Sequence, residues 1–123
     1  MRSLWIAVAG SAGALSRYQL EGFISRHTRG AFPWGTLVVN ASGCFVLGLL
    51  FTLLTERFLP HPYLRSALTI GFLGAYTTFS TFAFETVRLA EDGARGLALL
   101  NVVVSVAVGV AAAWFGIVAG RTL

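Results

Sequence analysis

Four long apolar segments, separated by short polar breaks, restrict most strongly what this chain can fold into. They cover about residues 4–24, 34–58, 64–89 and 97–120. A membrane-spanning helix needs about 20 predominantly apolar residues, so each segment is long enough to cross a bilayer. The sequence therefore predicts an all-α protein with four transmembrane helices in a single domain, residues 1–123.

The composition favours a membrane protein and argues against other classes. Only 11% of the residues are charged, compared with about 25% in an average soluble domain. The basic residues are all arginines and are scattered along the chain, which argues against nucleic-acid binding. The sequence has one cysteine and no motif that would support a metal cluster or a nucleophile–base pair, so we expect no enzyme.

The breaks between the segments, at residues 26–30, 60–62 and 91–96, define the topology. Four spans place both termini and the second break on one side of the membrane. The arginines then divide almost evenly, with Arg2, Arg57, Arg65 and Arg121 on that side and Arg26, Arg29, Arg88 and Arg95 on the other. Since basic loops favour the cytoplasm, this balance gives almost no preferred orientation. It reflects either noise in a short protein or insertion both ways up, which would allow an antiparallel dimer.

The third segment contains a stretch that a lipid-facing helix would not need. Residues 71–82 read GFLGAYTTFSTF, with two glycines followed by four hydroxyl side chains. Glycines weaken a helix, and hydroxyl groups compete for backbone hydrogen bonds, so we expect a break near residues 74–77. Unwound backbone at bilayer depth frees carbonyl oxygens that can coordinate a small cation. The alternative is an intact helix whose glycines pack against a neighbour.

Several side chains in the apolar segments are candidates for a binding site. Phe79 and Phe82 share a helix face, and their positive ring edges suit a small anion, although core packing explains them as well. Asn40 can donate two hydrogen bonds from its amide nitrogen, or it can link two helices. Arg17 is expected to reach the interface or to anchor the carbonyl groups of a partner. Glu85 is expected to pair with an arginine or to line a vestibule.

These motifs resemble those of the Fluc (CrcB) family of bacterial fluoride channels, over essentially the whole chain. The resemblance is carried by GALSRY at residues 13–18, GTLVVN at 35–40 and GFLGAYTTFSTF at 71–82. It implies a passive channel in the bacterial inner membrane that exports cytoplasmic fluoride and so reduces its toxicity. It also implies an antiparallel, dual-topology homodimer with two pores, a broken third helix and a structural sodium ion at the dimer centre.

The resemblance assigns roles to individual residues. The main-chain oxygens of Gly74 and Thr77 would hold the sodium ion. The fluoride pore would be lined by Asn40, Phe79 and Phe82 and by the hydroxyl groups of Thr36, Ser80 and Thr81, with Arg17 near the vestibule. These pore residues are neutral, as an anion must be able to leave again. Some family members carry a pore tyrosine on the fourth helix, where this chain offers only Asn101 and Ser105.

Two other classes of membrane protein remain open on the residues alone. A four-helix multidrug exporter has a similar length, but it depends on an acidic residue in its first span, and this chain has none there before Glu21. A membrane scaffold would account for the glycines in the spans. It would not account for Asn40 together with the hydroxyl-rich stretch, so the polar residues favour a channel.

Overall fold

The structure is a computed structural model that describes residues 1–58 and 61–123, and within these ranges it contains helices and no strand. The elements are α1 (Arg2–His27), α2 (Trp34–Thr52), η1 (Leu53–Arg57), α3 (Pro62–Ser66), η2 (Ala67–Leu73), α4 (Gly74–Tyr76), α5 (Phe79–Glu91) and α6 (Arg95–Thr122). The segments η1 and η2 are π-helical turns that continue α2 and α3. The predicted all-α class is confirmed. Pro60, at the predicted second break, lies outside the described residues.

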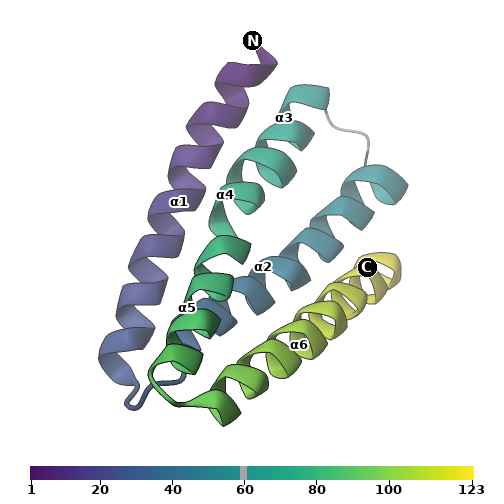
Figure 1. Cartoon of the computed structure of the whole chain (residues 1–123). Helices are drawn as coiled ribbons and strands as arrows, with labels where there is room; N and C mark the ends of the chain where they lie inside the picture. Colours follow the sequence, from purple (N-terminus) through teal and green to yellow (C-terminus); the bar gives the residue numbers. More distant parts are fainter. Residues whose placement is uncertain (59–60) are drawn as a thin grey trace.

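The helices form an antiparallel bundle in which α3 and α4 lie between α1 and α2, and α5 packs against α6 (Figure 1). Helix α1 packs along η2 and α4, while α2 and α6 pack against each other. The Arg2 guanidinium lies 5.8 Å from the centre of the Tyr63 ring, and Arg121 pairs with Glu56 at 3.3 Å. Both termini and the start of α3 therefore lie toward one end of the bundle, as the topology predicted.

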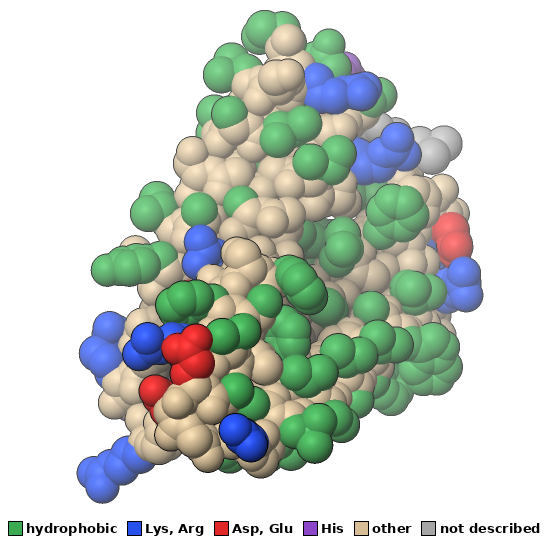
Figure 2. Space-filling view, in the orientation of Figure 1, with side chains coloured by type: hydrophobic (Ala, Val, Ile, Leu, Met, Phe, Trp, Pro, Cys, Tyr) green, Lys and Arg blue, Asp and Glu red, His purple; other side chains and the backbone are tan. Residues whose placement is uncertain are grey.

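Among the described residues, three helical stretches are long and apolar enough to span a membrane: Trp34–Arg57, Pro62–Glu91 and Arg95–Thr122. Each coincides with one predicted span to within two residues at either end. Helix α1 has 26 residues, which is enough to cross a bilayer, but it is more polar than the other three stretches. Figure 2 shows hydrophobic side chains over the middle of the visible face and charged side chains mainly toward its two ends. The chain is a multi-pass membrane protein.

Glycines allow the backbones of α2 and α6 to approach closely. A Cβ atom added at Gly48 would collide with the carbonyl oxygen of Ala113, and one added at Gly116 would collide with that of Phe45. Small residues at helix interfaces are the usual basis of close packing in membranes, where van der Waals contact replaces the hydrophobic effect. This pair of helices supplies one wall of the site described below.

A second glycine contact joins α1 to the third helical segment. A Cβ atom at Gly13 would collide with the Phe72 carbonyl, and one at Gly71 would lie 2.7 Å from the Ile6 carbonyl oxygen. These contacts hold the first half of the third segment against α1, just before the point at which its helix stops.

Candidate functional site

The third helical segment is interrupted at Thr77 and Thr78. Helix α4 ends at Tyr76 and α5 begins at Phe79, and the two threonines between them have extended backbones, with ψ of 154° and 111°. The break therefore lies at the end of the predicted interval 74–77 and one residue beyond it. Gly74 itself is helical, with φ −62° and ψ −36°, so the glycines are not where the helix opens. Gly71 serves close packing against α1 instead, and the β-branched threonines adopt the extended conformation.

Asn40 on α2 replaces the helical partners of Thr78. Its Nδ2 donates to the Thr78 carbonyl at 2.9 Å, and the Thr78 N–H donates to its Oδ1 at 2.7 Å. Both backbone groups of an unwound residue are thus satisfied within the bundle, as an apolar environment requires. Asn40 therefore links two helices, one of its two predicted roles. Its amide nitrogen carries a second hydrogen that this pair does not use.

The same rearrangement leaves the carbonyl groups of Gly74 and Thr77 without their helical donors. In an unbroken helix the Thr78 N–H would bond the carbonyl of Gly74, but it bonds Asn40 instead. The Thr81 N–H would bond the carbonyl of Thr77, but it bonds the Thr78 side-chain oxygen at 3.2 Å, which caps α5. The two carbonyls predicted as cation ligands are therefore among those that lose their helical donors.

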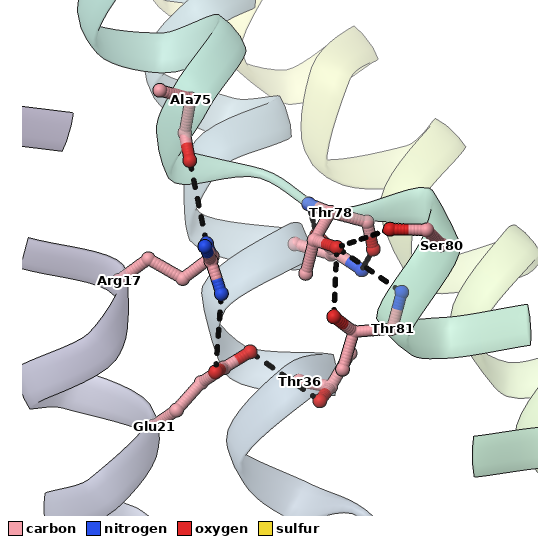
Figure 3. A network of polar contacts seen from close by, with 8 residues as sticks. Arg17, Glu21, Thr36, Ala75, Thr78, Ser80 and Thr81 are labelled. Carbon is pink, nitrogen blue, oxygen red and sulfur yellow. Dashed lines mark hydrogen bonds and ion pairs between the residues drawn. The ribbon is translucent and has the colours of Figure 1, made fainter. Parts of the chain in front are cut away.

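Two further contacts hold the backbone before the break. Arg17 Nε on α1 donates to the Ala75 carbonyl at 3.3 Å (Figure 3). The Tyr76 hydroxyl lies 2.9 Å from Ser42 Oγ, and Ser42 donates to a backbone carbonyl on α2, so Tyr76 is the donor of this pair. Sequence reasoning missed Ser42 and Tyr76. Two features of the sequence could have pointed to them: Ser42 is a second polar residue close to Asn40, and Tyr76 directly precedes the two threonines.

A groove of about 280 Å³ opens beside the break, between α2, α5 and α6. Its lining includes Asn40, Thr78, Phe79, Phe82 and Ser105, and the described residues that line it carry no charge. The rings of Phe79 and Phe82 lie 5.7 Å apart between centroids and are tilted by 56°. Phe79 is 79% exposed, so the groove is open on this side of the single chain. Three of the predicted pore residues therefore lie together.

Three of the other predicted polar residues line a second, smaller cavity of about 160 Å³ between α1, α2 and α5. Thr36, Thr81 and Glu85 lie there with Glu21, and Glu85 Oε1 is buried without a hydrogen-bond partner among the described residues. Glu85 thus lines a cavity, one of its two predicted roles. We call this the polar cavity. It differs from the groove in that carboxylates form part of its wall.

Arg17 and the hydroxyl groups connect the polar cavity to the break. Arg17 pairs with Glu21 at 3.6 Å, and Thr36 makes a long contact of 3.5 Å to the same carboxylate (Figure 3). Arg17 thus anchors a carbonyl group, as one interpretation expected, although the carbonyl belongs to its own chain. On the other side, Thr78 Oγ1 donates to Thr81 Oγ1 at 3.0 Å and lies 3.4 Å from the exposed Ser80.

Helix α6 adds one polar side chain to the groove. Ser105 lines it, whereas Asn101 is only 1% exposed and lies between α5 and α6. Asn101 Nδ2 donates to Thr86 Oγ1 at 2.9 Å, and Ser105 donates to Asn101 Oδ1 at 3.1 Å. Asn101 therefore packs two helices together and is not exposed in the groove.

Comparison with known proteins gives consistent matches over nearly the whole chain. The family described as "CrcB-like protein, Camphor Resistance (CrcB)" matches residues 4–117. A protein of Solibacter usitatus named fluoride-specific ion channel FluC is 51% identical over 121 residues, which cover 98% of this chain and 99% of the relative. Proteins with the same name in Magnetococcus marinus and Acidobacterium capsulatum are 46% and 43% identical, each over 100% of this chain and over 100% and 98% of the relative.

Proposed function

The chain belongs to the CrcB family, and on this premise we propose that it is a fluoride-selective passive ion channel of the bacterial inner membrane. The relatives are named ion channels, so the family is one of channels and not of enzymes, as the sequence predicted. The named relatives also argue against the multidrug exporter and the scaffold. We also propose that the channel exports fluoride, that it forms an inverted dimer with two pores, and that a sodium ion lies at the dimer centre.

The observation that carries the proposal is the broken helix beside an uncharged groove. Water-exposed or ligand-exposed backbone is tolerated at membrane depth where it lines a cavity or pathway. The break at Thr77 and Thr78 lies at such a groove, and α5 then places Phe79 and Phe82 along its wall. A pathway of neutral groups can bind an anion weakly enough to release it, which conduction requires.

Fluoride suits the groups that line this pathway. The anion is small and strongly hydrated, so a selective passage must offer donors as water leaves. The unused amide hydrogen of Asn40 is one donor, and the hydrogen-bearing edges of Phe79 and Phe82 carry partial positive charge. We propose that the anion passes between these groups and the hydroxyls of Thr36, Ser80 and Thr81. Arg17 would lie beside this path at the vestibule, where its pairing with Glu21 offsets its charge.

A second, inverted copy of the chain would complete the passage. Phe79 is 79% exposed, and the groove is open on this side of the single chain. Polar groups of Asn40 and Thr78 facing lipid would be costly, so we propose that a partner covers them. The even division of arginines between the two ends favours a partner in the opposite orientation. Twofold symmetry then gives two equivalent pores in each dimer.

The released carbonyls support the structural sodium ion. Gly74 and Thr77 offer oxygen ligands, the type that hard cations prefer. The described residues hold no cluster of histidine, cysteine, aspartate or glutamate that could bind a metal. Two oxygens are too few to surround an ion, but the inverted partner would double the set. We propose that sodium bound there joins the two broken helices at the centre of the dimer.

Passive transport by this channel would export fluoride. Neutral hydrogen fluoride crosses membranes and ionises in a near-neutral cytoplasm, which traps the anion. The membrane potential, negative inside, drives an anion outward through a selective pore. The channel would therefore lower cytoplasmic fluoride and reduce its toxicity.

Fluoride efflux from liposomes tests the function directly. Purified protein is reconstituted in liposomes loaded with potassium fluoride, and a fluoride electrode follows release after valinomycin sets the potential. We expect fluoride efflux without a proton gradient, and no comparable chloride efflux, read with a chloride electrode, from matched liposomes loaded with potassium chloride. Absence of fluoride release, or release that requires a proton gradient, would contradict a passive fluoride channel.

A further inference from the structure

A chain of three hydrogen bonds joins α5 to α6 and ends in the groove. Thr86 Oγ1 donates to the Phe82 carbonyl at 2.8 Å. Asn101 Nδ2 lies 2.9 Å from the same Thr86 oxygen, and Ser105 Oγ lies 3.1 Å from Asn101 Oδ1. Asn101 is 1% exposed, whereas Ser105 lines the groove together with Phe82.

The first of these bonds determines the direction of the other two. A hydroxyl group has a single hydrogen, and that of Thr86 is donated to a backbone carbonyl. Thr86 can therefore only accept from Asn101, which places the amide nitrogen toward Thr86 and the amide oxygen toward Ser105. An amide oxygen cannot donate, so Ser105 must donate its own hydrogen to Asn101. The Ser105 oxygen then faces the groove with lone pairs alone.

We propose that Asn101 is a positioning residue of the ion pathway, which makes Ser105 a hydrogen-bond acceptor toward the groove. The inference rests on the proposed fluoride channel and concerns the same groove. An acceptor repels a bare anion but binds water, so fluoride passes Ser105 with a water molecule between them. Ser105 thereby differs from Asn40, whose free amide hydrogen points to direct contact with the ion.

This arrangement limits how tightly the groove binds its ion. A hydroxyl hydrogen beside the two phenylalanines would add a charge-assisted hydrogen bond, which is about twice as strong as a neutral one. An ion held by that bond would leave more slowly, and conduction requires release. Asn101 keeps this hydrogen occupied within the helix pair.

Two substitutions release the Ser105 hydrogen by different routes. Asn101→Leu removes the amide oxygen that accepts it. Thr86→Val keeps Asn101 but removes the acceptor of its amide nitrogen, which leaves the amide free to turn and donate to Ser105. In both variants the freed Ser105 hydrogen can bond either the ion or the backbone carbonyl one turn earlier on α6. The bond to the ion is charge-assisted and therefore stronger, so the hydroxyl donates to the ion.

The experiment measures single-channel current in planar bilayers over a series of fluoride concentrations. For Asn101→Leu and Thr86→Val we expect the half-saturating concentration and the maximal current to fall, the former about tenfold. Adding Ser105→Ala to either variant should return both values to those of Ser105→Ala alone, because the freed hydrogen is then absent. If Asn101→Leu does not assemble, Thr86→Val carries the test.

Three results would overturn the role of Asn101. They are unchanged currents in both variants, shifts that persist when Ser105→Ala is added, and a large loss of fluoride affinity in Ser105→Ala alone. The second would mean that Asn101 and Thr86 act only through helix packing. A wild-type chain that carries no fluoride current would instead contradict the proposed function itself.

Discussion

At the scale of single residues, Asn40 combines a structural and a proposed functional role in one amide group. Its oxygen and one of its hydrogens bond the backbone of Thr78, while the second hydrogen is left for a ligand in the groove. Neither a carboxylate nor an aliphatic side chain offers an acceptor oxygen together with N–H donors. The residue type is therefore restricted by the break as well as by the ion.

Replacing Asn40 by aspartate tests both roles together. A carboxylate oxygen in Asn40→Asp would face the Thr78 carbonyl where Nδ2 now donates, and the negative charge would repel the anion. We expect a loss of stability of about 1–3 kcal/mol and a fluoride efflux rate lower by tenfold or more, about 1.4 kcal/mol or above in the barrier. Thermal unfolding in detergent and liposome efflux measure the two. Wild-type values in both assays would show that the Asn40–Thr78 pair is dispensable.

Phe82 and Phe84 offer a matched pair of substitutions on one helix. Phe82 lines the groove, whereas Phe84 points elsewhere on α5 and is 66% exposed. Phe82→Ile removes a ring edge that we propose contacts fluoride, and we expect efflux to fall about tenfold, about 1.4 kcal/mol in the barrier. Phe84→Ile should conduct within about twofold of the wild type. Equal efflux in the two variants would remove Phe82 from the pathway.

At the scale of elements, the glycine contacts decide how closely α2 and α6 approach and thus how wide the groove is. Gly116 faces the backbone of α2, whereas Gly96, near the start of the same helix, has no atom within 4 Å of an added Cβ. Alanine at Gly116 must therefore push the helices apart, and alanine at Gly96 meets open space.

Alanine substitution at these two glycines should have opposite effects. Gly116→Ala is expected to destabilise the protein by about 1–3 kcal/mol, because the added methyl group collides with the Phe45 carbonyl. Gly96→Ala should stabilise it by about 0.4–1 kcal/mol, through the lower entropy of the unfolded chain. Thermal unfolding in detergent compares them. A Gly116→Ala protein as stable as Gly96→Ala would show that the α2–α6 contact is adaptable.

At the scale of the whole molecule, the even division of arginines leads to a prediction about insertion. In a background with Cys44→Ser, the substitution Leu123→Cys places a single thiol at the C-terminus. We expect a membrane-impermeant thiol reagent to label about half of the chains in sealed, right-side-out vesicles and the rest after permeabilisation. Labelling of nearly all chains from one side would rule out insertion in both orientations.

The sodium proposal belongs to the same scale, because it requires two chains. If the carbonyls of Gly74 and Thr77 from both copies bind the ion, sodium stabilises the dimer by mass action. We expect a larger dimer fraction in sodium than in an equal concentration of the bulky cation N-methylglucamine, measured by size-exclusion chromatography in detergent. A dimer fraction that does not depend on the cation, even after prolonged dialysis, would argue against the central ion.

Part of the site could be predicted from the sequence because polar groups are conspicuous in apolar segments. Asn40, Phe79 and Phe82 lie in one groove, while Thr36, Thr81 and Glu85 lie in a separate polar cavity. The prediction of where the helix breaks was less accurate. Glycine spacing pointed toward Gly74, but that residue is helical, because its missing side chain does not by itself unwind a helix whose neighbours are packed.

The sequence by itself determined that the chain is a helical membrane protein, where its segments begin and end, and which family it belongs to. Hydrophobicity over about 20 residues and short motifs are local properties, which can be read without knowing the neighbours. The tertiary structure alone decided which groups meet. Asn40 reaches Thr78 across 38 positions and Arg17 reaches Ala75 across 58. Such hydrogen bonds depend on how closely the helices pack. Packing therefore decides which carbonyl groups lose their helical donors, and it decides that Ser105 donates its hydrogen to Asn101.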